Sequence, residues 1–291
     1  MPKEEMTAAY IAKNYSHQLN SDALAYAQLL VQGCTTFFKT PEAGVNYILS
    51  AASEFALEEL GAEAENTFRA YCRALWLEDT ALEKRWTERT TNDAIDEAFA
   101  TLNQQGVVAL QNVGGTVSMG WAEVQADIDK QVKKKKKVLG GTFYHAQDTE
   151  RAVAGKGFRL TFGAIDDSEE GARRVANTIL QALRDEGVAC QWDGNEEERI
   201  FVLPFVWKKR RTTRAPARQS PVPWRSLSHA DGRRWEIAGL NNRVCTRFTD
   251  SGGVSERQTP AKDLRGEIEE LVAEQVADGF VETSPPAGAQ L

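Results

Sequence analysis

The sequence is poor in the residues that build metal centres and disulfide frameworks. Its 291 residues include three histidines and four cysteines. The cysteines are Cys34, Cys72, Cys190 and Cys245. They lie far apart and contain no C-x-x-C pair, which argues against a zinc ribbon and against a dense disulfide framework. We therefore expect no metal, no cofactor and a cytoplasmic location, where thiols stay reduced.

Long apolar runs and the common catalytic motifs are also missing. No apolar stretch approaches the length of a membrane span, and residues 1–6 lack the basic-then-apolar order of a secretory signal. There is no P-loop, no Rossmann glycine pattern, no GxSxG and no HExxH. These absences predict no membrane partner and favour a binding protein, while an enzyme stays open.

Charge is distributed unevenly along the chain. Residues 1–105 hold 8 Lys and Arg against 16 Asp and Glu, a net charge of −8. Residues 208–234 hold 9 against 1, a net charge of +8, and the whole chain has a net charge of −7. An acidic body thus carries one strongly basic segment, so any contact with nucleic acid would be local.

Apolar periodicity predicts helices in the first 105 residues. One face carries Val45, Ile48, Leu49, Ala52, Phe55 and Leu60 at three- and four-residue steps. Thr40 followed by Pro41 suits the start of this helix. We expect further helices over residues 64–89, with Leu82 facing inward, and over residues 91–106.

The pattern changes at Gly106, where short strand-like segments begin to alternate with helical ones. Strands are expected at residues 107–110, 142–145, 157–162, 188–192 and 199–206. Ser118 would cap one intervening helix, and the acidic residues 166–170 would open another. This order predicts a central α/β sandwich-like domain over residues 106–207. We expect the N-terminal helices to contact it, since they carry more aromatic bulk than a thin bundle needs.

Residues 208–223 are predicted to be a basic linker, because they hold too few apolar residues to fold alone. Beyond it we expect strands at residues 224–228, 234–240, 243–249 and 254–258, a two-residue turn at Asn241-Asn242 and a helix from Thr259-Pro260 to Gly279. Residues 284–291 are expected to be a disordered tail. The fold class is therefore α+β, with an N-terminal helical domain (1–105), the central domain, and a C-terminal small β-sheet with one long helix (224–283).

The middle block resembles an uncharacterised bacterial domain family. The residues that carry the likeness are Gly106–Asn112, Gly120–Trp121, Phe143–Ala152, Gly157–Gly163 and Trp192–Gly194, which include F-Y-H-x-Q-D and W-D-G motifs. They cover roughly a third of the chain, about one domain. The resemblance implies a bacterial cytosolic setting and no particular reaction.

The C-terminal block resembles a WGR-like domain, a small sheet backed by one long helix. The matching segments are Arg234–Ile237, Arg243–Phe248, Gly252–Val254 and Asp278–Glu282. Some WGR domains bind DNA ends through the Trp-Gly-Arg motif, and the corresponding positions here are Phe248-Thr249-Asp250. An aspartate at the arginine position would face phosphate with like charge, so the resemblance favours the fold more than DNA binding.

The stretch around His145 places an imidazole, an amide and a carboxylate within four residues. A candidate ligand or partner site here comprises His145, Gln147, Asp148, Asn112, Thr116 and Asp193. His145 could act as a general base oriented by Asp148. In the alternative, His145 is structural, Asp148 caps the next helix and Asp193 only forms a turn. Nothing in the spacing of His145, Asp148 and Asp193 demands a metal.

The basic linker supplies the candidates for nucleic-acid contact. They are Lys208, Lys209, Arg210, Arg211 and Arg214. A flexible basic arm can bind phosphate without a fixed shape, but no aromatic residue precedes Trp224 in it, so such binding would be weak and non-specific. Docking of the linker on the acidic N-terminal residues is the alternative. The run at residues 133–137 is expected to be a solvated helix end.

We expect a cytosolic bacterial interaction or regulatory protein that binds a protein partner, with a neutralising or defence role. Two alternatives stay open. One is an enzyme with a small site around His145. The other is a nucleic-acid-associated protein that uses the basic linker and the WGR-like module.

Overall fold

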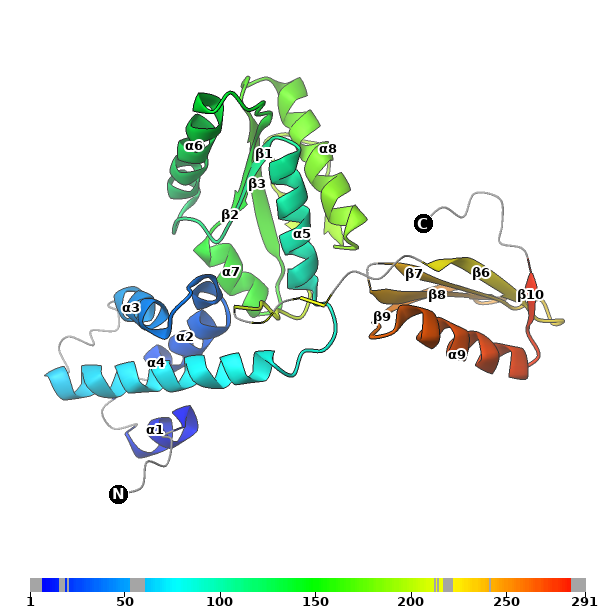
Figure 1. The fold of residues 1–291 in the computed structure, drawn as a ribbon, viewed down its shortest axis with the longest axis horizontal. Coiled ribbons are helices and arrows are strands. Elements are labelled where there is room, and N and C mark those ends of the chain that lie inside the picture. The colour runs from blue at the N-terminus through cyan, green and yellow to red at the C-terminus, as the bar shows by residue number, and fades with distance from the viewer. Residues whose placement is uncertain are drawn as a thin grey trace. The chain divides into compact units, whose positions relative to one another are not determined.

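A computed structural model describes residues 7–15, 19, 21–52, 61–211, 213, 215–216, 222–240 and 242–283. Within these residues the chain is an α+β protein, as predicted, with helices first, a mixed sheet next and an antiparallel sheet last. The chain divides into two compact units, Met1–Arg85 with Thr91–Arg214 and Trp86–Thr90 with Ala215–Leu291. The first unit thus contains both the helical part and the α/β part (Figure 1).

The helical part comprises α1 (Ala8–Asn14), α2 (Ser21–Gln32), η1 (Cys34–Phe37, a 3-10 turn), α3 (Pro41–Ala51) and α4 (Gly61–Glu83). α3 begins as the sequence predicts: Thr40 accepts a hydrogen bond from a backbone amide of the first turn, and Pro41 is the first helical residue. Phe55 and Leu60, expected on the same apolar face, lie outside the described residues. The core of this part includes Leu30, Ile48, Phe68 and Tyr71.

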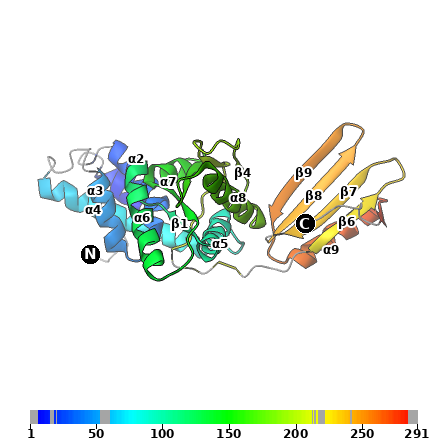
Figure 2. The same cartoon turned by 90° about the horizontal axis from the view of Figure 1, so that it is seen from above.

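The α/β part is built on a five-stranded sheet with the order β1-β2-β3-β5-β4. Its strands are β1 (Val107–Gln111), β2 (Gly140–Tyr144), β3 (Phe158–Ala164), β4 (Cys190–Gln191) and β5 (Ile200–Val202). Its helices are α5 (Thr91–Gln104), α6 (Val117–Lys133), α7 (Ala146–Val153) and α8 (Glu169–Asp185). β1 and β2 are parallel, and the other neighbours are antiparallel. α5 and α8 cover one face and α6 covers the other (Figures 1 and 2).

Alternation along the strands explains this packing on two faces. Val107 belongs to the core under α5 and α8, whereas Val108 packs beneath α6. Gly120 lets α6 approach β2 closely, since a Cβ there would lie 2.1 Å from the Phe143 ring. The three-layer core fixes the end of β2, and so fixes His145 at the start of α7.

The structure differs from the sequence-based expectation at several boundaries. α5 packs on β1 and α8, so it belongs to the α/β part, and the expected boundary at residues 105/106 lies within one compact unit. α4 ends at Glu83 rather than at residue 89, and Leu82 is 48% exposed because it faces away from the core. Thr116, not Ser118, caps α6, because it is Thr116 that accepts the Met119 amide at 3.3 Å.

The N-terminal helices contact the α/β part, which confirms the expectation. Tyr26 of α2 donates a hydrogen bond to the Glu150 carboxylate of α7 at 3.2 Å. The Cys34 thiol of η1 lies 3.7 Å from the carbonyl oxygen of Ala146. α7 therefore lies between the helical part and the sheet.

The C-terminal unit is an antiparallel sheet backed by a helix. Its strands are β6 (Val222–Ser228), β7 (Arg234–Leu240), β8 (Arg243–Asp250), β9 (Gly253–Pro260) and β10 (Val281–Thr283), in the order β10-β6-β7-β8-β9. α9 (Leu264–Ala277) covers one face, and Figure 2 shows the strands side by side. Leu240 pairs with Arg243, and of the predicted turn at Asn241-Asn242, Asn241 lies outside the described residues. α9 begins after Asp263 rather than at Thr259-Pro260, because those two residues extend β9.

Candidate functional site

His145 begins a helix rather than ending a strand. Nδ1 of His145 accepts a hydrogen bond from the backbone N–H of Asp148 at 3.2 Å. In return, the Asp148 carboxylate accepts one from the backbone N–H of His145 at 3.4 Å. This reciprocal pair is a capping box, with histidine in the position that serine or threonine usually takes. Sequence reasoning gave the N-cap to Asp148, whereas Asp148 is the third residue of α7 and closes the box.

The buried surroundings of the pair favour the structural interpretation. Nδ1 also lies 3.1 Å from Asp148 Oδ2, but a nitrogen that accepts an amide proton has none to give a carboxylate, so we assign the accepting role. Asp148 also accepts from the Arg159 amide and from Arg199, at 3.4 and 3.3 Å. His145 is 6% exposed. Both groups are therefore committed to holding β2, α7 and β3 together.

The other four candidates do not converge on His145. Asn112 accepts a hydrogen bond from the Thr149 hydroxyl at 2.8 Å and so joins the end of β1 to α7. Thr116 caps α6. Asp193 accepts a hydrogen bond from the backbone N–H of Asn195 at 3.0 Å, in agreement with the alternative that it only forms a turn. Gln147 is exposed on the first turn of α7.

A partly buried polar chain beside His145 was missed at the sequence level. Tyr144 donates to Gln111 at 2.8 Å, and Gln111 donates to Asp96 at 2.8 Å. Lys209 then donates to the same Asp96 oxygen. Burial raises the pKa of the Tyr144 phenol well above its ordinary value. The contact between these two side chains follows from the parallel pairing of β1 and β2, in which Gln111 lies opposite Tyr144.

The first residues of the predicted linker do not form a free arm. The side chains of Lys209, Arg210 and Arg211 are 8%, 5% and 1% exposed. Each pairs with a carboxylate of α4 or α5. Lys208 is half-buried, and Arg214 lies outside the described residues. These cations could reach nucleic acid only after their ion pairs opened, so the geometry favours the docked alternative.

The two most buried thiols are poor nucleophiles. Burial raises the pKa of Cys34 to about 12 and that of Cys72 to about 12. Such thiols stay protonated at neutral pH, and only the thiolate attacks. Burial also raises the pKa of Cys190 and of Cys245.

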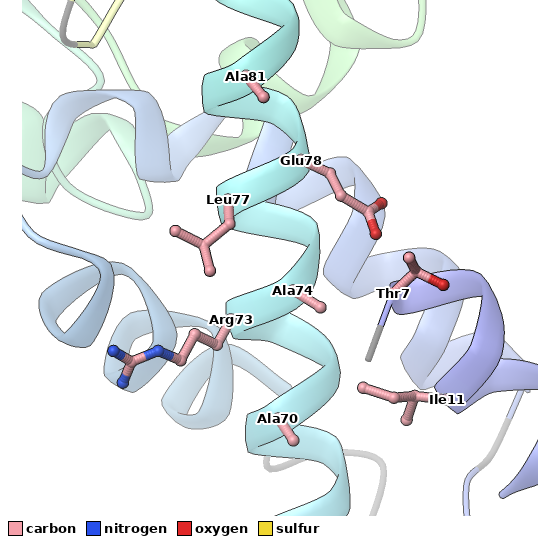
Figure 3. Close-up of a pocket in the computed structure, with 8 residues that line it drawn as sticks. All are labelled: Thr7, Ile11, Ala70, Arg73, Ala74, Leu77, Glu78 and Ala81. Atoms are coloured by element: carbon pink, nitrogen blue, oxygen red, sulfur yellow. The ribbon is translucent and has the colours of Figure 1, made fainter. Parts of the chain in front are cut away.

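An apolar groove lies between α1 and α4 and was also missed at the sequence level. One part has a volume of about 500 Å³ and is lined by Ile11 of α1 and by Ala70, Ala74, Leu77 and Ala81 of α4, among others (Figure 3). An adjoining part of about 560 Å³ shares Ile11 and Ala70 and extends to Ala62. Leu77 is 51% exposed. The usable signal was the set of small residues on one face of α4, at helical spacing.

Across the described ranges, no group of three or more His, Cys, Asp or Glu side chains could hold a metal ion. Among the helices in that part of the chain, none combines the length and the apolar character that crossing a membrane requires.

Comparison with known proteins identifies a family for most of the first unit. The family described as Domain of unknown function (DUF6891) matches residues 21–211, from the first residue of α2 to Arg211. No curated protein and no solved structure matches the chain. The matched region spans more than half of the chain and includes the His145 capping box, the partly buried polar chain and the docked basic residues. The chain therefore belongs to the DUF6891 family of domains of unknown function.

Proposed function

We propose that this protein acts in the cytoplasm by binding a protein partner, in an interaction or regulatory role. The observation that carries the proposal is the groove between α1 and α4. We assign its occupant as an amphipathic helix of the partner. Helix-in-groove binding uses apolar anchors spaced at i, i+3, i+4 and i+7 against a hydrophobic groove.

The shape of the groove suits a helix. Its floor consists of the alanines of α4, and small residues let a second helix approach closely. From Ala62 to Ala81 the groove extends for about 28 Å, at 1.5 Å per residue. Figure 3 shows Ala70 and Ala74 on the side of α4 nearer Ile11 of α1, and Leu77 projecting from the other side of α4.

The charge around the groove points to a partner helix with a basic flank. Residues 1–105 have a net charge of −8. Glu63, Glu78 and Arg73 line the groove; Glu78 accepts the backbone N–H of Ala8 at 2.8 Å, and Arg73 is paired with Glu42 at 2.9 Å. Complementary charge of this kind steers encounter and fixes orientation more than it adds affinity.

The C-terminal unit bears on the nucleic-acid alternative. We propose that it is WGR-like, on the basis of its antiparallel sheet with one helix on a single face and of the segments that resemble that family. At the end of β8 the chain reads Phe248-Thr249-Asp250, and Asp250 accepts the Gly252 amide at 2.7 Å. A carboxylate repels phosphate, so we rank protein binding above nucleic-acid association, and both above an enzyme at His145.

The groove is tested by photo-crosslinking in the native host. A photoreactive amino acid replaces Leu77 in one variant and Leu82 in a matched control. Leu82 lies on the same helix and is 48% exposed, but it lines neither part of the groove. We expect a specific crosslinked partner from position 77 and not from position 82, with the crosslinked peptide lying in a helical region of the partner.

Affinity then separates binding from mere proximity. Leu77→Glu should weaken the purified complex at least tenfold, about 1.4 kcal/mol, while Leu82→Glu leaves the Kd unchanged. Both variants should keep the free energy of unfolding within about 0.5 kcal/mol, as is usual for surface changes. Equal affinity for both variants, or the same crosslinks from both positions, would remove the groove as the binding site.

A further inference from the structure

The segment after β5 lies across the helical part as a basic strap, defined as residues 207–211 and 213. Its described residues belong to no helix or strand. The backbone N–H of Lys208 donates to the Asn92 side chain at 2.7 Å, and that of Arg211 donates to the Glu83 carboxylate at 3.0 Å. These amides bond to side chains of other elements rather than to a sheet or helix ladder. An extended peptide bound to a receptor is held in the same way.

The strap covers an acidic patch, defined as Asp79 and Glu83 of α4 with Asp93 and Asp96 of α5. The three ion pairs are Arg211–Asp79, Arg210–Asp93 at 3.0 Å and Lys209–Asp96. Asp93, which meets the Arg210 guanidinium, is 3% exposed, and Glu83 is fully buried and accepts the Thr213 hydroxyl at 2.8 Å. A buried carboxylate left without a compensating group is strongly destabilising. The patch therefore needs an occupant rich in arginine and lysine.

The present occupant does not satisfy every donor around the patch. The Arg211 guanidinium lies over the Trp76 ring at 5.1 Å, and Lys209 lies over the Phe37 ring at 5.0 Å. Within the described part of the chain, Nε of Arg211 and Nε1 of Trp76 are buried and have no hydrogen-bond partner. Trp76 is 4% exposed. Unsatisfied buried donors of this kind are uncommon in native proteins and call for an explanation.

We propose that the acidic patch is a binding site for an extended segment of a partner protein rich in arginine and lysine, with the basic strap as its resident intramolecular ligand. The proposal rests on the proposed function, because it gives the chemistry of a partner, but it uses residues that do not line the groove. A short tether gives the strap an effective concentration on the order of millimolar. A partner segment therefore displaces the strap only when other contacts concentrate it at the site.

The test uses full-length protein and a labelled peptide with the sequence of residues 207–214, Trp-Lys-Lys-Arg-Arg-Thr-Thr-Arg. The receptor is the double variant Arg210→Gln/Arg211→Gln, in which the strap is weakened. We expect it to bind the peptide at least tenfold more tightly than the wild-type chain does. A peptide with glutamine at every Lys and Arg position should not bind. Adding Asp79→Asn and Asp93→Asn to the double variant should abolish binding of the basic peptide.

Several results would overturn the proposal. They are equal affinity of wild type and double variant, absence of binding to a double variant that is folded by circular dichroism, and a concentration-dependent dimer in which a second copy supplies the strap. If the double variant does not fold, hydrogen exchange of residues 207–211 in the wild type is measured with excess peptide. Faster exchange supports displacement, and unchanged exchange refutes it. If the peptide test fails but position 77 still crosslinks to a partner, only the acidic-patch proposal is refuted and the groove proposal is unaffected.

Discussion

At the scale of single residues, the polar side chains near His145 form short reciprocal pairs rather than an open constellation. His145 and Asp148 cap α7, and Asn112 and Thr149 join β1 to α7. The composition of this stretch was readable from the sequence, and so were its two interpretations. The choice between a general base and a structural cap depended on the burial of His145 and on which hydrogen bonds it and Asp148 accept. Those properties arise from contacts with β3 and with Arg199, 51 residues away.

A change at His145 should therefore alter stability before it alters binding. His145→Ala removes the side-chain acceptor of the cap, and we expect the free energy of unfolding to fall by about 1 kcal/mol. His145→Asn is the matched control, because asparagine keeps an acceptor that suits the N-cap position. Urea unfolding measures both variants. A normal stability for His145→Ala, together with loss of partner binding per folded molecule, would instead make His145 a site residue.

The four thiols should separate into two classes. In the folded chain, burial raises the pKa of the Cys34 thiol from its ordinary value of 9.0 to about 12, and it does the same for Cys72. The stabilisation linked to these two protons is fully present below about pH 9 and is lost as the pH rises through about 12. At pH 8.5 we expect iodoacetamide to modify the half-buried Cys190 and Cys245 first.

Mass spectrometry of tryptic peptides measures this order. In denaturant all four thiols should react at similar rates, which serves as the control. Modification of Cys34 or Cys72 in the native protein as fast as Cys190 would show that the helical core opens readily.

At the scale of elements, a local helix-start signal predicted the structure correctly only where no long-range pairing opposed it. Thr40-Pro41 marked the start of α3 because capping depends only on neighbouring residues. Thr259-Pro260 carries the same pair, but the chain continues there as β9, since pairing with β8 outweighs a local helix start. The groove beside α4 follows from alanine spacing, yet only the position of α1 shows that the face is a groove.

At the scale of the whole molecule, net charge predicted that two segments attract each other, but the sequence alone did not show which residues meet. The segment 208–234 and residues 1–105 carry net charges of +8 and −8. Which carboxylates meet which cations depended on the fold, because Arg211 and Asp79 are 132 residues apart in the chain. The strap adds to the α7 contacts that join the helical and α/β parts into one compact unit: it follows β5 and bonds to α2, α4 and α5.

Limited trypsin digestion should report this arrangement. A protease needs an extended, accessible chain, and the side chains of Lys209 to Arg211 are at most 8% exposed. The lysines at residues 133–137 are all exposed around the end of α6. We expect the first cuts within the described residues at 133–137, and slow cleavage at 209–211.

The nicked halves should stay together on gel filtration, because α5, β1 and the strap hold them. The double variant Arg210→Gln/Arg211→Gln should become sensitive at Lys209. Early release of a stable fragment ending near residue 105, or first cleavage at 209–211 in the wild type, would contradict a single unit held by a docked strap.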